Sequence, residues 1–140
     1  AKTSNPSSGE LQDKKIGEKE IYSQMADMIE NWGSHSINEY GYSNAGAVVG
    51  ATYKNQLLQL RNKNKSVFFL VPGYGAQGGG AEDVVPAFDE RGLGAIINSS
   101  RAIMCAYKKG GYDEKDFAKA AKDEALRMKN EIISKIGKIG

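Results

Sequence analysis

Residues 66–80 read SVFFLVPGYGAQGGG, an apolar segment followed by a run rich in glycine. The segment up to Pro72 carries no charge, and proline lacks the amide that a continuing strand would use, so we predict a buried strand that ends there. Five of the nine residues from Pro72 to Gly80 are glycine. A helix is predicted directly after them, over residues 81–88, so the stretch has the strand, turn and helix order of an α/β protein.

The same alternation continues on both sides of this stretch. Two more short segments are apolar and uncharged, as strands buried in a parallel sheet are, and helical patterns separate them. This order predicts right-handed βαβ units in a parallel sheet. The predicted strands are residues 45–52, 66–72 and 94–99, and the predicted helices are residues 55–61, 81–88, 101–107 and 112–135, with Asp113 as the N-cap of the last.

Further helical structure is predicted in the first 33 residues. Ser7 or Ser8 is the expected N-cap of a helix that starts near this point, and a helix is predicted to end at Gly33. Apolar periodicity assigns a buried stripe to the helix that ends at Gly33 and a buried face to the last helix of the chain. The stripe consists of Ile21, Met25, Ile29 and Trp32, and the face consists of Phe117, Ala121, Leu126, Met128, Ile132, Ile133 and Ile136.

The length of the chain bears on how this sheet is completed. An open sheet of three or four such strands would leave two apolar, uncharged edges, which natural proteins avoid. A closed (β/α)8 barrel has no edges but typically needs about 250 residues, whereas this chain has 140. Residues 2–4 look like the tail of a further strand. We therefore predict that residues 1–140 form one half of a barrel, as a single segment without an internal boundary.

Composition excludes several classes of protein. The 19 basic and 17 acidic side chains give a net charge of +2, which does not favour nucleic acid or an anionic membrane as the main partner. The single cysteine has no partner for an internal disulfide. No apolar run approaches the roughly 20 residues that span a bilayer, and no signal-like start is present. The expected location is the cytoplasm.

Two loops at predicted strand ends suit an anion. In the first, Gly73, Gly75 and Gly78 would let backbone amides approach a phosphate, and the following helix would add a partial positive charge. The loop lacks the Gly-Lys-Ser/Thr of a Walker A motif and the acidic residue of a dinucleotide fingerprint. A flexible strand-to-helix connection is the alternative interpretation.

The second loop, NSSR at residues 98–101, repeats this geometry. Ser99 and Ser100 are candidate helix caps, and the guanidinium of Arg101 suits a phosphate; a plain capped helix with a solvated arginine is the alternative. Two consecutive loops of this kind, the second leading into a short helix, match the phosphate site after strands seven and eight of a (β/α)8 barrel.

Other polar features point to no additional site. Residues 13–18 are expected to be a solvated helix face. His35 is the only histidine, so there is no histidine pair for zinc, and it is expected in a loop. Cys105, in an apolar segment without a nearby histidine, is expected to be buried. No metal site is predicted.

Four motifs, in order, resemble orotidine 5'-phosphate decarboxylases of the longer bacterial type, in the C-terminal half of the enzyme. They are TSNPS at 3–7, VGAT at 49–52, VPGYGAQGG at 71–79 and NSSR at 98–101. The resemblance implies the part of a (β/α)8 barrel from the end of strand 5 through strand 8 and the final helix. It also implies a homodimeric carboxy-lyase of pyrimidine biosynthesis that converts orotidine monophosphate to uridine monophosphate (UMP) without a cofactor.

The resemblance assigns roles to residues of this chain. Ser4 would hydrogen-bond the pyrimidine, Gln77 would bridge the phosphate and the pyrimidine, and Tyr74 would line the pocket. The phosphate would be held by the loop glycines Gly75 and Gly78, by the Arg101 side chain and by the amides of Ser100 and Arg101.

The catalytic Asp-x-Lys-x-x-Asp array of that family is absent from this chain. Its nearest match, Asp13-x-Lys15-x-x-Glu18, lies in the wrong place, so no catalytic residue is predicted here. The array is expected in a missing N-terminal half-barrel, in the same or another chain. Two alternatives remain: a phosphosugar isomerase or aldolase on a related barrel, and a non-catalytic nucleotide-binding half-barrel. Gln77 favours the decarboxylase over the first, because those enzymes have no pyrimidine for this amide to bind.

Overall fold

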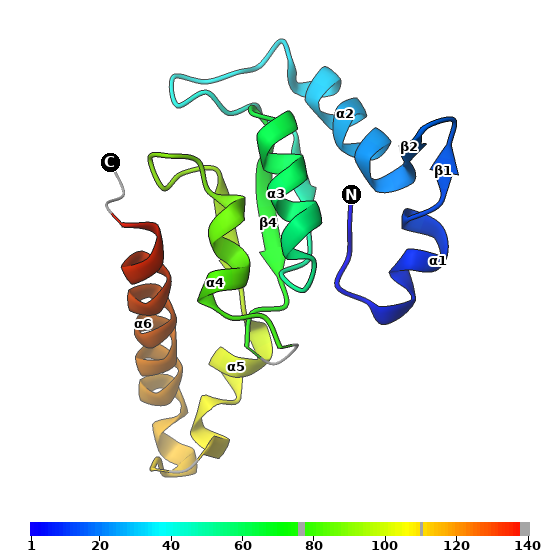
Figure 1. The fold of residues 1–140 in the computed structure, drawn as a ribbon. Coiled ribbons are helices and arrows are strands. Elements are labelled where there is room, and N and C mark those ends of the chain that lie inside the picture. The colour runs from blue at the N-terminus through cyan, green and yellow to red at the C-terminus, as the bar shows by residue number, and fades with distance from the viewer. Residues whose placement is uncertain (76–77, 110, 138–140) are drawn as a thin grey trace.

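The computed structural model describes residues 1–75, 78–109 and 111–137 (Figure 1). The strands are β1 (Lys15–Ile16), β2 (Lys19–Glu20), β3 (Gly46–Val48), β4 (Phe68–Pro72) and β5 (Ala95–Asn98). The α-helices are α1 (Gly9–Gln12), α2 (Ile21–Gly33), α3 (Lys54–Lys63), α4 (Ala81–Val84), α5 (Ser100–Met104) and α6 (Phe117–Ile136). The 3-10 helices are η1 (Pro6–Ser8), η2 (Val85–Ala87), η3 (Ala106–Lys109) and η4 (Glu114–Asp116).

The three predicted strands form one parallel sheet in the order β3-β4-β5. A fourth segment lies parallel to β3 on its free edge, because the Gly50 amide donates to the Lys2 carbonyl at 2.7 Å and the Lys2 amide donates to the Val48 carbonyl at 3.2 Å. The prediction that residues 2–4 are the tail of a strand is confirmed at Lys2, which forms an isolated bridge to the sheet. The backbones approach so closely that a Cβ on Gly50 would lie 2.7 Å from the Ser4 nitrogen.

The helices cover one face of this sheet (Figure 1). Strand residues on that face, such as Phe69, pack against the helices in a single core. The opposite face of the sheet is partly exposed, so the prediction that the strands are buried on both faces is wrong. The core includes Ala47, Val49, Phe69 and Val71 of the sheet with Tyr22, Ala26, Ile29, Leu57, Leu60, Ala81, Val84, Met128 and Ile132 of the helices. The exposed apolar residues of the strands are Val48, Phe68, Leu70 and Ile96.

Helix α2 forms as predicted, but a different stripe of the helix is buried. Of the predicted stripe only Ile29 is buried, and Trp32 is 56% exposed. The buried face instead contains Tyr22, Ala26, Ile29 and Gly33, and Gly33 lies close against Ser43 and Ala45 just before β3. These residues also have helical spacing, so the predicted period was right and the predicted face was wrong.

The N-terminal segment differs from the prediction at two points. Residues 13–18 are exposed, as expected, but they belong to an antiparallel pair, β1 and β2, that turns through Gly17 at φ 67°. Neither Ser7 nor Ser8 caps a helix through its side chain; Ser8 is buried, and its hydroxyl lies 3.0 Å from the Tyr53 hydroxyl.

The C-terminal helix begins later than predicted. Asp113 precedes η4, and Asp116 is the N-cap residue of α6. Phe117 and Leu126 are exposed, contrary to the predicted apolar face, whereas Met128 and Ile132 are buried.

The helices in the second half of the chain are also shorter than predicted. The helix predicted over 81–88 divides into α4 and η2, which contains Pro86. Cys105 is exposed, contrary to its predicted burial, and lies between the end of α5 and the start of η3. None of the described helices is long and apolar enough to cross a membrane.

Candidate phosphate-binding site

The carboxyl ends of the parallel strands meet at one edge of the sheet, toward the lower end of Figure 1. Ser4 lies at this edge against Gly50, beyond the end of β3. The loop after β4 and residues 98–101 after β5 lie along the same edge. In parallel α/β sheets this edge is where ligands bind.

The glycine-rich loop folds back on itself. The Gly75 amide donates to the Gly79 carbonyl at 2.7 Å, and the Gly79 amide donates to the Gly73 carbonyl at 3.3 Å. Gly73 and Gly75 have φ values of 101° and 76°, a region that other residues rarely adopt. A Cβ on Gly79 would lie 2.9 Å from Cβ of Ala51, so the loop also rests against the end of β3.

Tyr74, between those two glycines, is held at both its backbone and its side chain. The Ser99 hydroxyl donates to the Tyr74 carbonyl at 2.7 Å, and the Tyr74 hydroxyl donates to Oε2 of Glu131 on α6 at 2.5 Å. The residue is only 3% exposed. Burial and the bond to Glu131 raise the pKa of Tyr74 to about 12, so the hydroxyl stays protonated and remains a donor at neutral pH.

A cavity of about 220 Å³ opens between the two strand-end loops. Arg101 is the charged residue in its lining and is exposed, whereas Ser99 is buried. The cavity therefore presents a positive charge beside polar groups, as an anion site requires. It is lined by Pro72, Gly73, Tyr74, Asn98, Ser99, Ser100 and Arg101.

The structure brings together part of the predicted site. Tyr74, Ser100 and Arg101 line the cavity, and a Cβ on Gly75 would lie 3.4 Å from the Ser99 hydroxyl. Two other predicted residues, Gly78 and Ser4, are not among those that line it. Gly78 donates its amide to the Gly75 carbonyl, Ser4 lies three strands from β5 in the sheet, and Gln77 lies outside the described residues.

The sequence did not reveal the contacts of two residues in this region. Ser99 is the N-cap residue of α5, as predicted, but its hydroxyl donates to the Tyr74 carbonyl and makes no cap hydrogen bond. Glu131 had no signal in the sequence, since it lies 57 positions from Tyr74 on a lysine-rich helix. Only the packing of α6 against the loop brings them together.

The nearest sequence match to a catalytic array lies elsewhere, as predicted. Asp13 accepts from Lys2 Nζ at 2.6 Å, and Lys15 and Glu18 are exposed in and beside the β1–β2 pair. His35 is exposed in a turn, as expected. Within residues 1–75, 78–109 and 111–137, no group of three or more His, Cys, Asp or Glu side chains is arranged to hold a metal ion.

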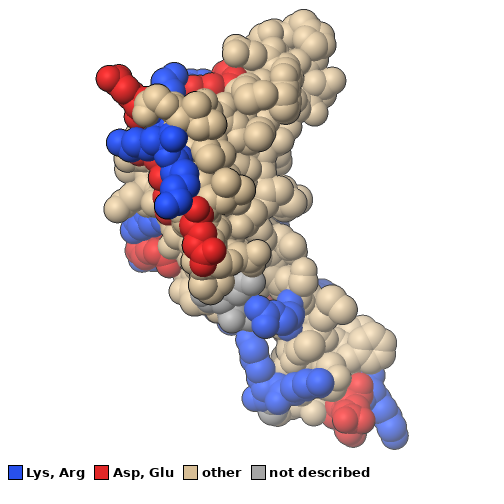
Figure 2. All heavy atoms as spheres, turned by 90° about the vertical axis from the view of Figure 1, so that its right-hand side faces the viewer, with Lys and Arg blue, Asp and Glu red and all other residues tan. Residues whose placement is uncertain are grey.

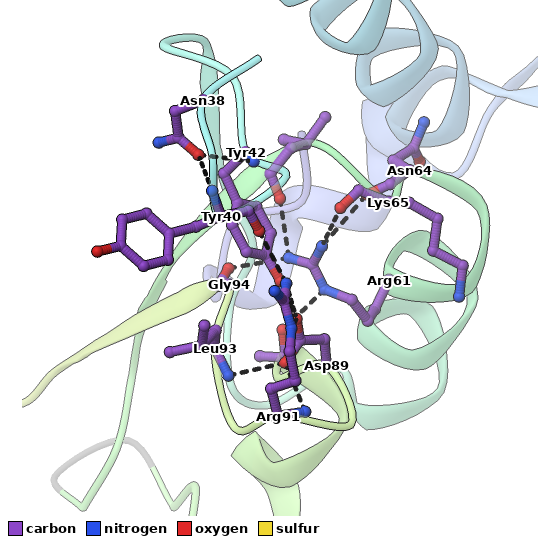
Figure 3. Close-up of polar contacts among 12 residues, drawn as sticks. Asn38, Tyr40, Tyr42, Arg61, Asn64, Lys65, Asp89, Arg91, Leu93 and Gly94 are labelled. Carbon is purple, nitrogen blue, oxygen red and sulfur yellow. Dashed lines mark hydrogen bonds and ion pairs between the residues drawn. The ribbon is translucent and has the colours of Figure 1, made fainter. Parts of the chain in front are cut away.

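A second polar cluster lies at the opposite end of the sheet (Figure 3). Arg61 of α3 is 4% exposed and donates all five of its N–H groups to backbone carbonyls. Its guanidinium carbon lies 4.0 Å from the ring centroid of Phe69. The five acceptors are the carbonyls of Ala87, Asn64, Lys65, Val67 and Gly94.

Asp89 organises the loop beside Arg61 (Figure 3). It accepts from the Tyr42 hydroxyl at 2.8 Å, from the Leu93 amide at 2.9 Å and from Arg91. Burial alone would raise the pKa of Asp89, but these hydrogen bonds lower it to about 2. Every donor of Arg61 and several acceptor positions of Asp89 are used within the fold, so this end of the sheet is built for stability.

Comparisons with known proteins agree with the resemblance found in the motifs. No protein-family model matches the chain. An orotidine 5'-phosphate decarboxylase of Rhodopirellula baltica is 41% identical over 135 residues, which is 94% of this chain and 45% of that protein. One of Clostridium tetani is 41% identical over 137 residues, 96% of this chain and 46% of that protein.

Solved structures give the same result. A structure of Leishmania donovani OMP decarboxylase matches with a TM-score of 0.65 at 30% identity, and covers 94% of this chain and 46% of that chain. The chain therefore spans about half the length of the relatives it matches. The predicted resemblance and the half-barrel fold are confirmed.

Proposed function

We propose that this chain, which matches orotidine 5'-phosphate decarboxylases over nearly its whole length, is the half of such an enzyme that binds the phosphate and the pyrimidine. The observation that best supports this proposal is the cavity between the two strand-end loops, because its lining includes residues of both loop motifs. Arg101 and the amides of Ser100 and Arg101 would bind the phosphate. Gly75 and Gly78, whose amides donate to carbonyls within the loop, would shape the backbone beside it. Ser4 and Gln77 would contact the pyrimidine.

Phosphate binding at this site would contribute to rate as well as to affinity. Interactions with a part of the substrate that does not react can be used to stabilise the transition state. The reacting carbon, C6 of the pyrimidine, needs a cationic acid to protonate the carbanion and an anionic neighbour near the departing carboxylate. Neither group is assigned to this chain, and both would come from the other half of the barrel. The reaction itself would need no cofactor.

The other half-barrel would cover the sheet face that this chain leaves exposed. Val48, Leu70 and Ile96 are paired positions on β3, β4 and β5, so their exposed side chains form one row across the sheet. Figure 2 shows one side of the molecule, where charged side chains gather along one margin and at one end and leave a broad area without charge. Surfaces of this kind are typical of interfaces. Assembly into a homodimer and a cytoplasmic location remain predictions.

We expect Leu70→Asp to prevent assembly with the catalytic half, because it places a charge in the middle of the row that the partner covers. The partner for the experiment is the part of the Rhodopirellula baltica enzyme that this chain does not match. Size-exclusion chromatography of the mixture measures assembly, and loss of orotidine monophosphate absorbance measures activity.

Leu58→Asp is the matched control. Leu58 is a leucine of similar exposure, 46% against 39% for Leu70, but it lies on α3 rather than in the sheet. The unchanged chain and Leu58→Asp should both form an active complex of two halves. A complex that tolerates Leu70→Asp as well as Leu58→Asp would contradict this role of the sheet face.

Ligand selectivity separates the proposal from the alternatives. Calorimetric titration of the assembled protein with UMP, uridine and ribose 5-phosphate should rank UMP first, because it offers both a phosphate and a pyrimidine. Equal affinity for UMP and ribose 5-phosphate would favour a phosphosugar enzyme. Tight UMP binding by the 140-residue chain alone, with no turnover in any mixture, would favour a non-catalytic binding module.

A further inference from the structure

We infer that Glu131, on the C-terminal helix, is a positioning residue for phosphate binding, and that it acts through Tyr74 on the glycine-rich loop. The inference rests on the proposed function and adds a residue outside all four sequence motifs. Glu131 lies on α6 and is not among the residues that line the cavity. Its contribution would therefore be to hold the loop in the conformation that a phosphate needs.

The loop depends on Tyr74 for its position. The neighbours Gly73 and Gly75 hydrogen-bond within the loop but carry no side chain that could attach it to other elements. Tyr74 adds a buried ring and two hydrogen bonds. Its carbonyl accepts from Ser99, which follows β5, and its hydroxyl donates to Glu131 on α6. Between Pro72 and Gly80, no other side chain in the described part of the loop offers a comparable anchor.

Glu131 is itself held in place by its own helix. Arg127 donates to Glu131 Oε2 at 2.8 Å and also to both oxygens of Glu124, at 2.9 and 3.0 Å. Lys109 of η3 pairs with Glu124 at 3.2 Å. The bond from Tyr74 and the charge of Arg127 lower the pKa of Glu131, so its carboxylate is ionised and accepts at neutral pH.

The network therefore connects three elements around the cavity. It runs from the loop after β4, through Glu131 and Arg127 on α6, to Lys109 at the end of the segment that follows Arg101. Loss of the Tyr74–Glu131 bond would let the loop occupy more conformations, and a bound phosphate would have to order it. A nucleoside has no phosphate, so its binding would not require the loop to become ordered.

The test compares UMP with uridine on the complete barrel, in Tyr74→Phe and Glu131→Ala variants. We expect UMP affinity to fall about tenfold in each variant and uridine affinity to change less than about twofold. Because both variants remove the same hydrogen bond, the double variant should be no weaker than the single ones. Tyr112→Phe is the matched control, since Tyr112 makes a similar bond to Asp123 on α6 at 3.0 Å and does not line the cavity. It should leave both affinities unchanged.

The outcomes of this test separate the proposed function of the chain from the positioning role of Glu131. Wild-type protein that binds uridine as tightly as UMP would overturn the proposed function. Wild-type protein that prefers UMP, with Tyr74→Phe and Glu131→Ala variants that keep the whole preference, would overturn only the positioning role. Equal losses for both ligands would also overturn it, because they indicate a general structural defect. Tyr74→Phe removes a single oxygen, so the test stands even where Glu131→Ala fails to fold.

Discussion

Arg61→Ala is expected to lower the free energy of unfolding by about 3–5 kcal/mol, the scale of losing a few buried hydrogen bonds to a charged group. The change leaves five backbone carbonyls without their donor and removes the cation from the face of Phe69. These carbonyls belong to the end of α3, the start of β4, η2 and the start of β5, so four parts of the chain lose a common partner (Figure 3). Urea denaturation followed by circular dichroism measures the loss.

Two further variants make this result specific to Arg61. Arg91→Ala should cost much less than Arg61→Ala, because the Arg91 side chain is half exposed and its pair with Asp89 is screened by water. Arg61→Lys should recover only part of the stability, since an ammonium has three donors and no planar fork. An Arg61→Ala variant no less stable than Arg91→Ala would show that the network contributes little.

Arg101→Ala is expected to weaken UMP binding by about 1.5–3 kcal/mol, or roughly 10- to 150-fold, the scale of a lost charge-assisted hydrogen bond. Arg101 is the one charged residue among the described residues that line the cavity, so no neighbour among them replaces its charge. Uridine binding should be almost unaffected, because it has no phosphate. Calorimetric titration of both ligands gives the two affinities directly.

Lys108→Ala is the control for Arg101. It removes one positive charge from the nearby η3 segment without touching the cavity, so it tests whether net charge alone attracts the nucleotide. We expect UMP binding to change less than about twofold, because exposed charges are screened by salt. Loss of uridine and UMP binding to the same extent in Arg101→Ala would argue against phosphate binding by this residue.

The predictions that the structure confirms concern elements that are determined by local interactions. The strands at 46–48, 68–72 and 95–98 fall inside apolar, uncharged segments, and the loop after Pro72 follows from its glycines. Helix α3 also follows, because good helix-forming residues occupy a short, uninterrupted segment. In these segments composition, backbone preference and chain order agree.

The predictions of burial that were wrong concern residues whose exposure depends on what packs against each element. The buried face of α2 includes Tyr22, Ala26 and Gly33, whereas hydrophobicity alone selected a neighbouring face with Trp32. The exposed sheet face looks like core in the sequence because Leu70 and Ile96 are as apolar as the residues that the helices cover. Cys105 and the preceding Met104 are both exposed, although their apolar neighbours suggested burial.

The sequence by itself determined the α/β order, the parallel strands and the two strand-end loops with Arg101, because these depend on residues close together in the chain. The tertiary structure alone decided which of the loop residues share a cavity, that Ser99 holds Tyr74, and that Glu131 reaches the loop from 57 positions away. Those contacts depend on how α5 and α6 pack around the ends of the strands. Packing of this kind is a property of the whole fold and leaves no periodic signal in the sequence.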